Sequence, residues 1–201
     1  MTDTVLLVDD DPAIRELFTI YLARGGFRPL AVAGGAACLE FLRTETPDLL
    51  VLDLMMEPMD GWETLEAITT NPAGAGIPVV IITGKQPVAA DILRFGPLIW
   101  DYRLKPVDME QVVKSFGPVI ERDRSLRRQL QEAITRGADP ELAGEYSRLL
   151  HLVRVAKKLE LRRRKSSWTE PVPVDRQETR LHDLHAQLGL SGTPLEDVHA
   201  P

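Results

Sequence analysis

The sequence of 201 residues is poor in cysteine, in aromatic residues and in long apolar runs, and each shortage excludes a class of protein. Its one cysteine, Cys38, excludes an internal disulfide framework and a cysteine-based zinc site, and it is typical of a reducing compartment. No apolar run reaches the ~18 residues of a membrane-spanning helix, and Met-Thr-Asp-Thr-Val does not begin a signal peptide. With 5% aromatic and 44% hydrophobic residues, we expect a cytoplasmic protein with an aliphatic core and no contact with membranes.

The charged residues, 27% of the chain, are unevenly distributed. Residues 1–120 contain nine Lys and Arg against 17 Asp and Glu, whereas residues 121–201 contain 15 against 13. The net charge of −6 therefore comes from the first part of the chain. An acidic first part and a mildly basic second part predict two units with different roles.

Short apolar segments alternate with amphipathic segments over the first 116 residues. Val5-Leu6-Leu7-Val8 is a continuous apolar run that stops at three aspartates. Such a run is typical of a strand that is buried on both faces. By this reasoning we expect strands at residues 5–8, 27–32, 49–52, 78–82 and 98–104, and helices at residues 14–21, 36–42, 62–68, 88–95 and 109–116. This alternation predicts an α/β fold with a doubly wound, five-stranded parallel sheet, because crossovers between parallel strands are right-handed.

The pattern changes after Gly117-Pro118, which breaks or kinks the fifth helix. Residues 118–165 predict an all-α helical hairpin, with its turn at Gly137-Ala138-Asp139-Pro140. Its second helix carries a narrow heptad-like seam of apolar residues: Leu142, Tyr146, Leu149, Val153 and Ala156. We therefore divide the chain into a domain at 1–117, the hairpin at 118–165, and a partly disordered linker with a short C-terminal helix at 166–201.

Polar side chains follow several of the expected strands at the point where each strand ends. Asp9 and Asp10 follow the first strand and Asp53 the third, while Thr83 and Lys105 follow the fourth and the fifth. Because ligands bind outside the carboxyl ends of strands in an open parallel sheet, we expect these groups at one rim. Clustered carboxylates favour a hard cation such as Mg²⁺, which also binds phosphate oxygens. The rim therefore predicts phosphoryl chemistry assisted by magnesium.

In order and spacing, these motifs resemble the receiver domain of two-component response regulators, of the chemotaxis-regulator type. The resemblance covers about residues 4–116 and rests on five short motifs: Val8-Asp9-Asp10, Leu52-Asp53-Leu54-Met55-Met56, Met59-Asp60-Gly61, Ile82-Thr83-Gly84 and Lys105-Pro106. It implies a flavodoxin-like sheet in the order 2-1-3-4-5 and a cognate sensor histidine kinase as partner. It also implies no enzymatic activity beyond the domain's own phosphorylation and dephosphorylation.

The resemblance assigns the phosphoryl group and the metal to particular residues. Asp53 matches the phosphoacceptor, whose carboxylate becomes an acyl phosphate. Asp10 matches the principal acid that binds Mg²⁺, Asp9 assists through a water molecule, and the backbone carbonyl of Met55 completes the protein ligands. The metal then neutralises charge during phosphoryl transfer.

The resemblance also assigns a conformational switch. Lys105 matches the lysine that pairs with the phosphoryl oxygens, and Thr83 matches the hydroxyl that moves to bond the phosphoryl group. Tyr102 matches the aromatic residue whose rotamer follows that movement. Such a switch needs a coupling free energy of only ~1–3 kcal/mol.

Two departures from the family pattern stand out. Glu57-Pro58 replaces the usual Pro-Gly, which adds a carboxylate near the site and bears on phosphoryl lifetime and metal affinity. Phe95-Gly96-Pro97 replaces the usual Gly-Ala-x-x-Tyr before the fifth strand, so the switch face is harder to predict.

Three hypotheses remain open for how the protein passes on its signal. In the main hypothesis, residues 118–165 form a homodimer through the seam or dock an unknown output partner, with DNA binding unlikely. In the second, the basic helix 154–165 contacts DNA, although no recognition module follows the receiver. In the third, His151 exchanges the phosphoryl group with Asp53 in a relay.

Overall fold

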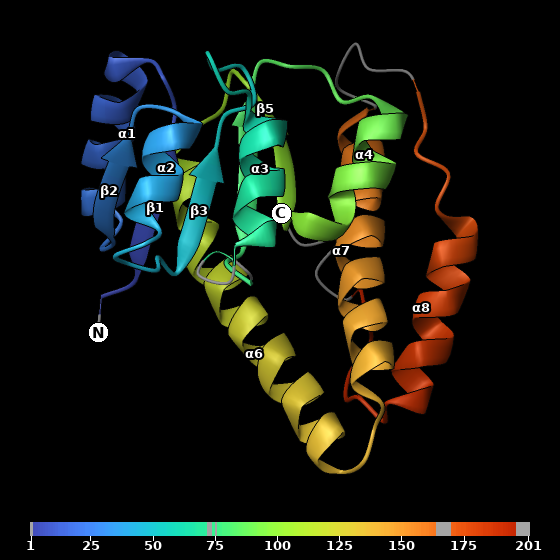
Figure 1. The fold of residues 1–201 in the computed structure, drawn as a ribbon. Coiled ribbons are helices and arrows are strands. Elements are labelled where there is room, and N and C mark those ends of the chain that lie inside the picture. Colours follow the sequence, from blue (N-terminus) through green and yellow to red (C-terminus); the bar gives the residue numbers. More distant parts are fainter. Residues whose placement is uncertain (1, 72–73, 75, 164–169, 196–201) are drawn as a thin grey trace. The chain divides into compact units, whose positions relative to one another are not determined.

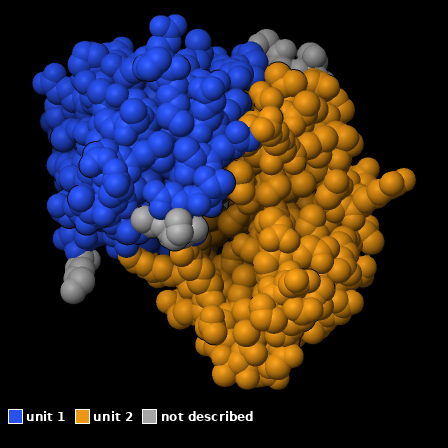
Figure 2. Space-filling model, in the orientation of Figure 1, with its two compact units in different colours: residues 1–86, 102–120 blue, residues 87–101, 121–201 orange. Residues whose placement is uncertain are grey.

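The computed structural model describes residues 2–71, 74, 76–163 and 170–195. Their contacts define two compact units, coloured separately in Figure 2. Unit 1 comprises residues 1–86 and 102–120, and unit 2 comprises residues 87–101 and 121–201. Within the described ranges, no helix is both long enough and apolar enough to cross a membrane.

Unit 1 is built on a sheet of five strands in the order β2-β1-β3-β4-β5. The strands are β1 (Thr4–Val8), β2 (Arg28–Val32), β3 (Leu49–Leu52), β4 (Val79–Thr83) and β5 (Asp101–Leu104). β1 pairs in parallel with both β2 and β3, and β3 pairs in parallel with β4. β1, β3 and β4 are buried along their whole length, as their continuous apolar runs require. The predicted fold class and strand order are therefore confirmed.

Four helices of unit 1 pack beside this sheet (Figure 1). They are α1 (Pro12–Arg24), α2 (Gly35–Phe41), α3 (Gly61–Thr70) and α5 (Met109–Lys114). α1 contacts α5, and α2 contacts α3. Asp11 caps α1, because its side chain accepts a hydrogen bond from the Ala13 amide, and Pro12 occupies the first turn. This cap starts α1 directly after the Asp9-Asp10 segment.

The remaining helices belong to unit 2, except that α6 begins in unit 1. They are α4 (Ala89–Phe95), the short 3₁₀ helix η1 (Gly96–Leu98), α6 (Phe116–Thr135), α7 (Pro140–Arg163) and α8 (Asp175–Gln187). α7 contacts η1, α8 and α4. Gly137, with a φ of 102°, ends α6 in the left-handed conformation that glycine favours, before Asp139 and Pro140 start α7.

The structure corrects the bounds of two predicted elements. The strand expected at 98–104 begins only at Asp101, because residues 96–98 form η1 instead. The helix expected at 109–116 ends at Lys114, and α6 begins at Phe116, because Pro118 has no N–H to donate to the carbonyl of Lys114. The division into 1–117, 118–165 and 166–201 stays a prediction, while the contacts of residues 87–101 group them with the C-terminal helices.

The seam predicted for self-association is largely covered within one chain. Tyr146, Val153 and Ala156 are all buried in unit 2. Leu152 and Val155, which lie off the seam, are buried as well, because α7 has partners on several sides. The other two seam residues, Leu142 and Leu149, are half-buried. In the predicted linker, residues 166–169 lie outside the described residues, as do residues 196–201.

Candidate functional site

The carboxyl ends of four strands bring the predicted site residues together in unit 1. Asp9 follows β1, Asp53 follows β3, Thr83 ends β4 and Lys105 follows β5. Backbone hydrogen bonds align these ends: the Asp53 amide donates to the Val8 carbonyl, and the Lys105 amide donates to the Thr83 carbonyl at 2.8 Å. The parallel register thus places all four residues at one rim of the sheet.

Lys105 bridges the two buried carboxylates of the rim. Its Nζ lies 2.7 Å from Oδ2 of Asp53 and 3.0 Å from Oδ2 of Asp9. Asp9 and Asp53 are only 2% and 6% exposed, whereas the Lys105 side chain is 28% exposed. One ammonium group therefore compensates two carboxylates that would otherwise repel each other.

The two carboxylates respond differently to this environment. Burial disfavours the charged form of Asp53, but hydrogen bonds from Lys105, Thr83 and the Met55 amide outweigh it, and the pKa of Asp53 is lowered. For Asp9, burial outweighs the bonds from Lys105 and the Asp11 amide, so its pKa is raised. Burial also opposes the charge on Lys105, yet its two carboxylate partners raise its pKa. Asp53 is thus the carboxylate that the site holds most firmly in its ionised form.

The loop between β3 and α3 fixes the backbone around Asp53. The Met55 amide donates to Oδ1 of Asp53 at 3.1 Å, while the Met55 side chain is 60% exposed. Asp60 and Glu63 form a capping box that starts α3. A Cβ atom on Gly61 would lie 2.2 Å from the Asp53 carbonyl oxygen, so only glycine fits this approach of α3 to the loop. In the Met-Asp-Gly motif, the glycine is therefore required because a side chain would collide with the backbone of the loop.

The two acids after β1 that are assigned to a metal differ in burial. Asp9 is held inside the rim, where its Oδ1 accepts from the Asp11 amide at 2.9 Å. Asp10 is exposed, and so is the added acid Glu57. Within the described part of the chain, no three acidic, histidine or cysteine side chains already converge on a metal position. The available donors are nonetheless hard oxygens, the kind that Mg²⁺ prefers.

Thr83 and Tyr102 are joined through the backbone of Lys85, a link that the sequence does not reveal. The Lys85 amide donates to the Thr83 hydroxyl at 3.2 Å, and the Tyr102 hydroxyl donates to the Lys85 carbonyl at 2.7 Å. Thr83 is fully buried, Tyr102 is 1% exposed, and the Tyr102 ring lies 6.3 Å from that of Trp62. Because the link uses only backbone atoms of Lys85, no residue type could signal it in advance.

His151, the candidate relay histidine, is sequestered in unit 2. Its Nδ1 lies 3.4 Å from the Pro97 carbonyl oxygen, and its Nε2 is buried without a hydrogen-bond partner. Burial and the nearby Arg154 lower the pKa of His151 to about 3. Since a buried nitrogen cannot meet a phosphoaspartate, the relay alternative does not fit this structure.

The basic residues of α7 also serve unit 2. The Arg154 guanidinium lies 4.3 Å from the centre of the Trp100 ring, and Arg162 forms a two-pronged ion pair with Asp101 at 2.9 and 3.2 Å. Lys157 pairs with Glu178, and Arg163 with Glu160. Positions 164 and 165 of the predicted basic helix lie outside the described residues. Four basic side chains of α7 thus have partners within unit 2, although those of Lys157, Arg162 and Arg163 stay partly exposed.

Curated relatives match somewhat more than half of this chain. DNA-binding response regulator MtrA of Mycolicibacterium smegmatis is 33% identical over 113 residues, which is 56% of this chain and 48% of that protein. Probable transcriptional regulatory protein TcrX of Mycobacterium tuberculosis is 32% identical over 120 residues, 59% of this chain and 50% of that protein. The chain thus spans about half the length of the curated relatives it matches.

Solved structures match the same fold. The N-terminal domain of a response regulator receiver protein from Methanoculleus marisnigri is 45% identical with a TM-score of 0.51, covering 59% of this chain and 97% of that one. The receiver domain of sensor histidine kinase PA1611 from Pseudomonas aeruginosa, described with magnesium in its active site cleft, has a TM-score of 0.54. At 22% identity over 60% of this chain and 99% of that one, it supports the fold alone.

A family model described as the response regulator receiver domain matches residues 5–116. That range contains every residue of the rim and all five strands, apart from Thr4 at the start of β1. The chain therefore belongs to the response regulator receiver family.

Proposed function

We propose that this protein is a two-component response regulator that accepts a phosphoryl group on Asp53 from a cognate histidine kinase. The observation that carries the proposal is the geometry of the rim, where the Lys105 Nζ lies 2.7 Å from Asp53 and 3.0 Å from Asp9; the lowered pKa of Asp53 agrees with it. An Asp53 carboxylate oxygen attacks the phosphorus of a phosphohistidine, the P–N bond breaks, and the electron pair returns to the imidazole. Transfer of this group and its later hydrolysis are the only reactions assigned to the domain.

Magnesium is the cofactor that suits the rim. Asp9 and Asp10 would hold Mg²⁺ together with Asp53 and the backbone carbonyl of Met55, since hard oxygen donors fit this ion. When bound, it supplies positive charge against the phosphoryl oxygens. Asp9, whose burial raises its pKa, then gains a second cation as partner beside Lys105.

Lys105 and Thr83 are the groups that would respond to the phosphoryl group. In the unphosphorylated site, Lys105 divides its hydrogen bonds between Asp9 and Asp53. A phosphoryl group on Asp53 offers Lys105 and the Thr83 hydroxyl new, more highly charged acceptors. A Thr83 hydroxyl turned toward that group weakens its bond with the Lys85 amide, and this change reaches Tyr102 through the Lys85 carbonyl.

The output is assigned to unit 2, which would dock a partner. The chain passes from Lys85 directly into residues 87–101 of unit 2 and returns at Tyr102, so both ends of this segment adjoin the switch. Docking of a partner suits unit 2 better than pairing through the seam, because Tyr146 and Val153 are already buried.

Labelling with a radioactive phosphodonor tests the proposal. Asp53→Asn should abolish a base-labile label on the full chain, because the amide lacks the nucleophilic oxygen, while Asp3→Asn makes the same change before β1 and should label normally. His151→Ala should also label normally. A label that survives in Asp53→Asn, or one that withstands base, would contradict the assignment.

A further inference from the structure

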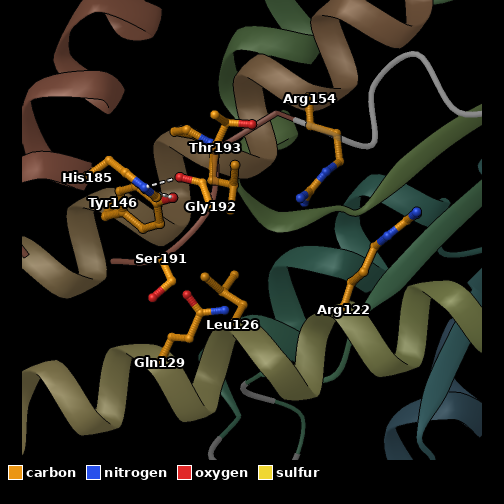
Figure 3. Close-up of a pocket in the computed structure, with 11 residues that line it drawn as sticks. Arg122, Leu126, Gln129, Tyr146, Arg154, His185, Ser191, Gly192 and Thr193 are labelled. Atoms are coloured by element: carbon orange, nitrogen blue, oxygen red, sulfur yellow. Dashed lines mark hydrogen bonds between the residues drawn. The ribbon is translucent and has the colours of Figure 1, made fainter. Parts of the chain in front are cut away.

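Unit 2 contains a cavity of about 320 Å³ that the receiver chemistry does not use. Side chains from α6 and α7 and the segment Ser191–Pro194 line it, and all of its lining residues belong to unit 2 (Figure 3). The volume lies at the lower end of the ~300–1,000 Å³ typical of sites for small molecules. The space is therefore suited to a compact ligand.

The lining is rich in hydrogen-bond donors and in positive charge. Arg122 from α6 and Arg154 from α7 both border the cavity, while no Asp or Glu occurs among the described residues that line it. Figure 3 shows these two arginines on different helices, with Gln129 and Ser191 near Leu126. Guanidinium groups match carboxylate and phosphate groups in geometry and charge.

Arg154 is the anchor of this lining. It is 4% exposed, and its guanidinium stacks 4.3 Å from the centre of the Trp100 ring. Trp100 is itself fixed, because its Nε1 donates to Asp123 at 3.2 Å. The stacking on Trp100 thus holds the Arg154 guanidinium in one orientation at the edge of the cavity.

His185 of α8 connects the segment Ser191–Pro194, which lines the cavity, to α7. The Tyr146 hydroxyl lies 2.9 Å from Nδ1 of His185, and Nε2 of His185 lies 2.9 Å from the Gly192 carbonyl oxygen. Leu126, Leu150 and Pro194 add apolar surface to the same space. The cavity thus combines a cationic side with an apolar side, inside a wall that hydrogen bonds hold in place.

We propose that this cavity binds a small organic anion, with its carboxylate or phosphate group toward Arg122 and Arg154 and a short apolar body beside Leu126. Because Arg154 lies on Trp100, which is two residues before Tyr102, occupancy of the cavity would also bear on the segment that adjoins the receiver switch. A regulator built in this way has two inputs, one covalent and one by ligand.

Titration calorimetry of the full chain with inorganic phosphate, succinate and glycerol 3-phosphate tests the proposal, with sodium chloride at equal ionic strength as reference. At least one probe should bind saturably, with a Kd on the order of 0.1–1 mM. The same probe should change tryptophan fluorescence, because Arg154 covers Trp100. Preference among the probes distinguishes a phosphate ligand from a carboxylate ligand.

Variants locate the binding. Arg122→Gln removes one cation at an exposed position, which spares the fold, and it should raise the Kd at least tenfold. Leu126→Trp fills the cavity and should abolish binding. Arg148→Gln, at an exposed position of α7 outside the cavity, should leave the Kd within twofold. No saturable binding up to 10 mM of any probe, or equal effects of Arg122→Gln and Arg148→Gln, would overturn the proposal.

Discussion

Asp53 in unit 1 and Asp123 in unit 2 are equally buried but differ in charge behaviour. They are 6% and 7% exposed, and each has a cationic partner. Lys105, Thr83 and the Met55 amide together lower the pKa of Asp53. For Asp123, burial dominates over Arg127 and Trp100, and the pKa is raised. Burial alone therefore does not decide the state of a carboxylate; the number and kind of donors around it do.

The comparison separates two uses of buried charge. In unit 1 the charged groups lie at strand ends, where the proposed phosphoryl group would offer Lys105 a new partner. In unit 2 Asp123 and Arg154 hold the Trp100 ring from two sides, and Arg162 holds Asp101. The first arrangement suits exchange of partners, whereas the second fixes residues 87–101 against α7.

The largest predicted effect is a loss of stability in unit 1. Gly61→Ala places a Cβ atom 2.2 Å from the Asp53 carbonyl oxygen and 2.6 Å from the Leu54 Cα. Because both are backbone atoms, we expect a loss of about 4–5 kcal/mol in the free energy of unfolding, and loss of phosphorylation. Chemical denaturation followed by circular dichroism measures it.

Gly117→Ala is the matched control. A Cβ atom on Gly117 meets no atom within 4 Å, and the residue lies in the first turn of α6. Alanine should leave stability unchanged or raise it by about 0.5–1 kcal/mol. Equal costs for the two substitutions would contradict a steric role for Gly61.

The next largest predicted effect is a loss of stability in unit 2. Trp100→Ala removes a side chain that is 3% exposed and packs against His151, Arg154 and Asp123, so unfolding should cost about 3–4 kcal/mol less. Asp53 should still accept a phosphoryl group, since the rim lies in unit 1. Leu161→Ala, at a side chain 43% exposed on α7, should cost less than about 0.5 kcal/mol. If Trp100→Ala costs no more than Leu161→Ala, the Trp100 cluster does not hold unit 2 together.

A further predicted effect is a dependence of the free energy of unfolding on pH. The pKa of His151 falls from 6.5 to about 3 on folding, because of burial and of Arg154. Below pH 6.5 the unfolded chain therefore binds a proton that the folded chain does not. Stability contributed by neutral His151 is complete above pH 6.5 and is lost as the pH falls toward 3, by at most about 1.4 kcal/mol per pH unit.

His151→Phe keeps a ring beside Trp100 and should flatten this pH dependence in denaturation curves measured between pH 4 and 7. His182→Gln changes a histidine at an exposed position of α8 and should retain the wild-type slope. The same slope in wild type and His151→Phe would show that His151 is not the group that titrates.

The sequence predicted the sheet of unit 1 well, because its strands are continuous apolar runs that end at polar residues. Asp9, Asp53 and Lys105 were found for the same reason: parallel strands bring their carboxyl ends together. Their roles in phosphoryl transfer remain predictions. The apolar residues 98–100 predict a strand, yet Ile99 and Trp100 are buried outside the sheet, and Trp100 packs against His151 and Arg154 of α7. Apolarity does not say which partner covers a segment.

Gly96 shows why the fourth helix was harder to assign. A Cβ atom on Gly96 would lie 2.9 Å from a methyl group of Leu152, so this glycine admits the close approach of η1 to α7. The departure Phe95-Gly96-Pro97 was visible in the sequence, but its partner lies more than fifty residues away. Such a contact depends on tertiary packing that local periodicity does not encode.

Hydrogen exchange of the full chain, with and without phosphorylation, tests most directly whether Asp53 controls unit 2. Phosphorylation should change amide protection in residues 87–101 and in α7 as well as at the rim, and Asp53→Asn should show neither change. A change confined to residues 1–86 and 102–120 would contradict an output through unit 2.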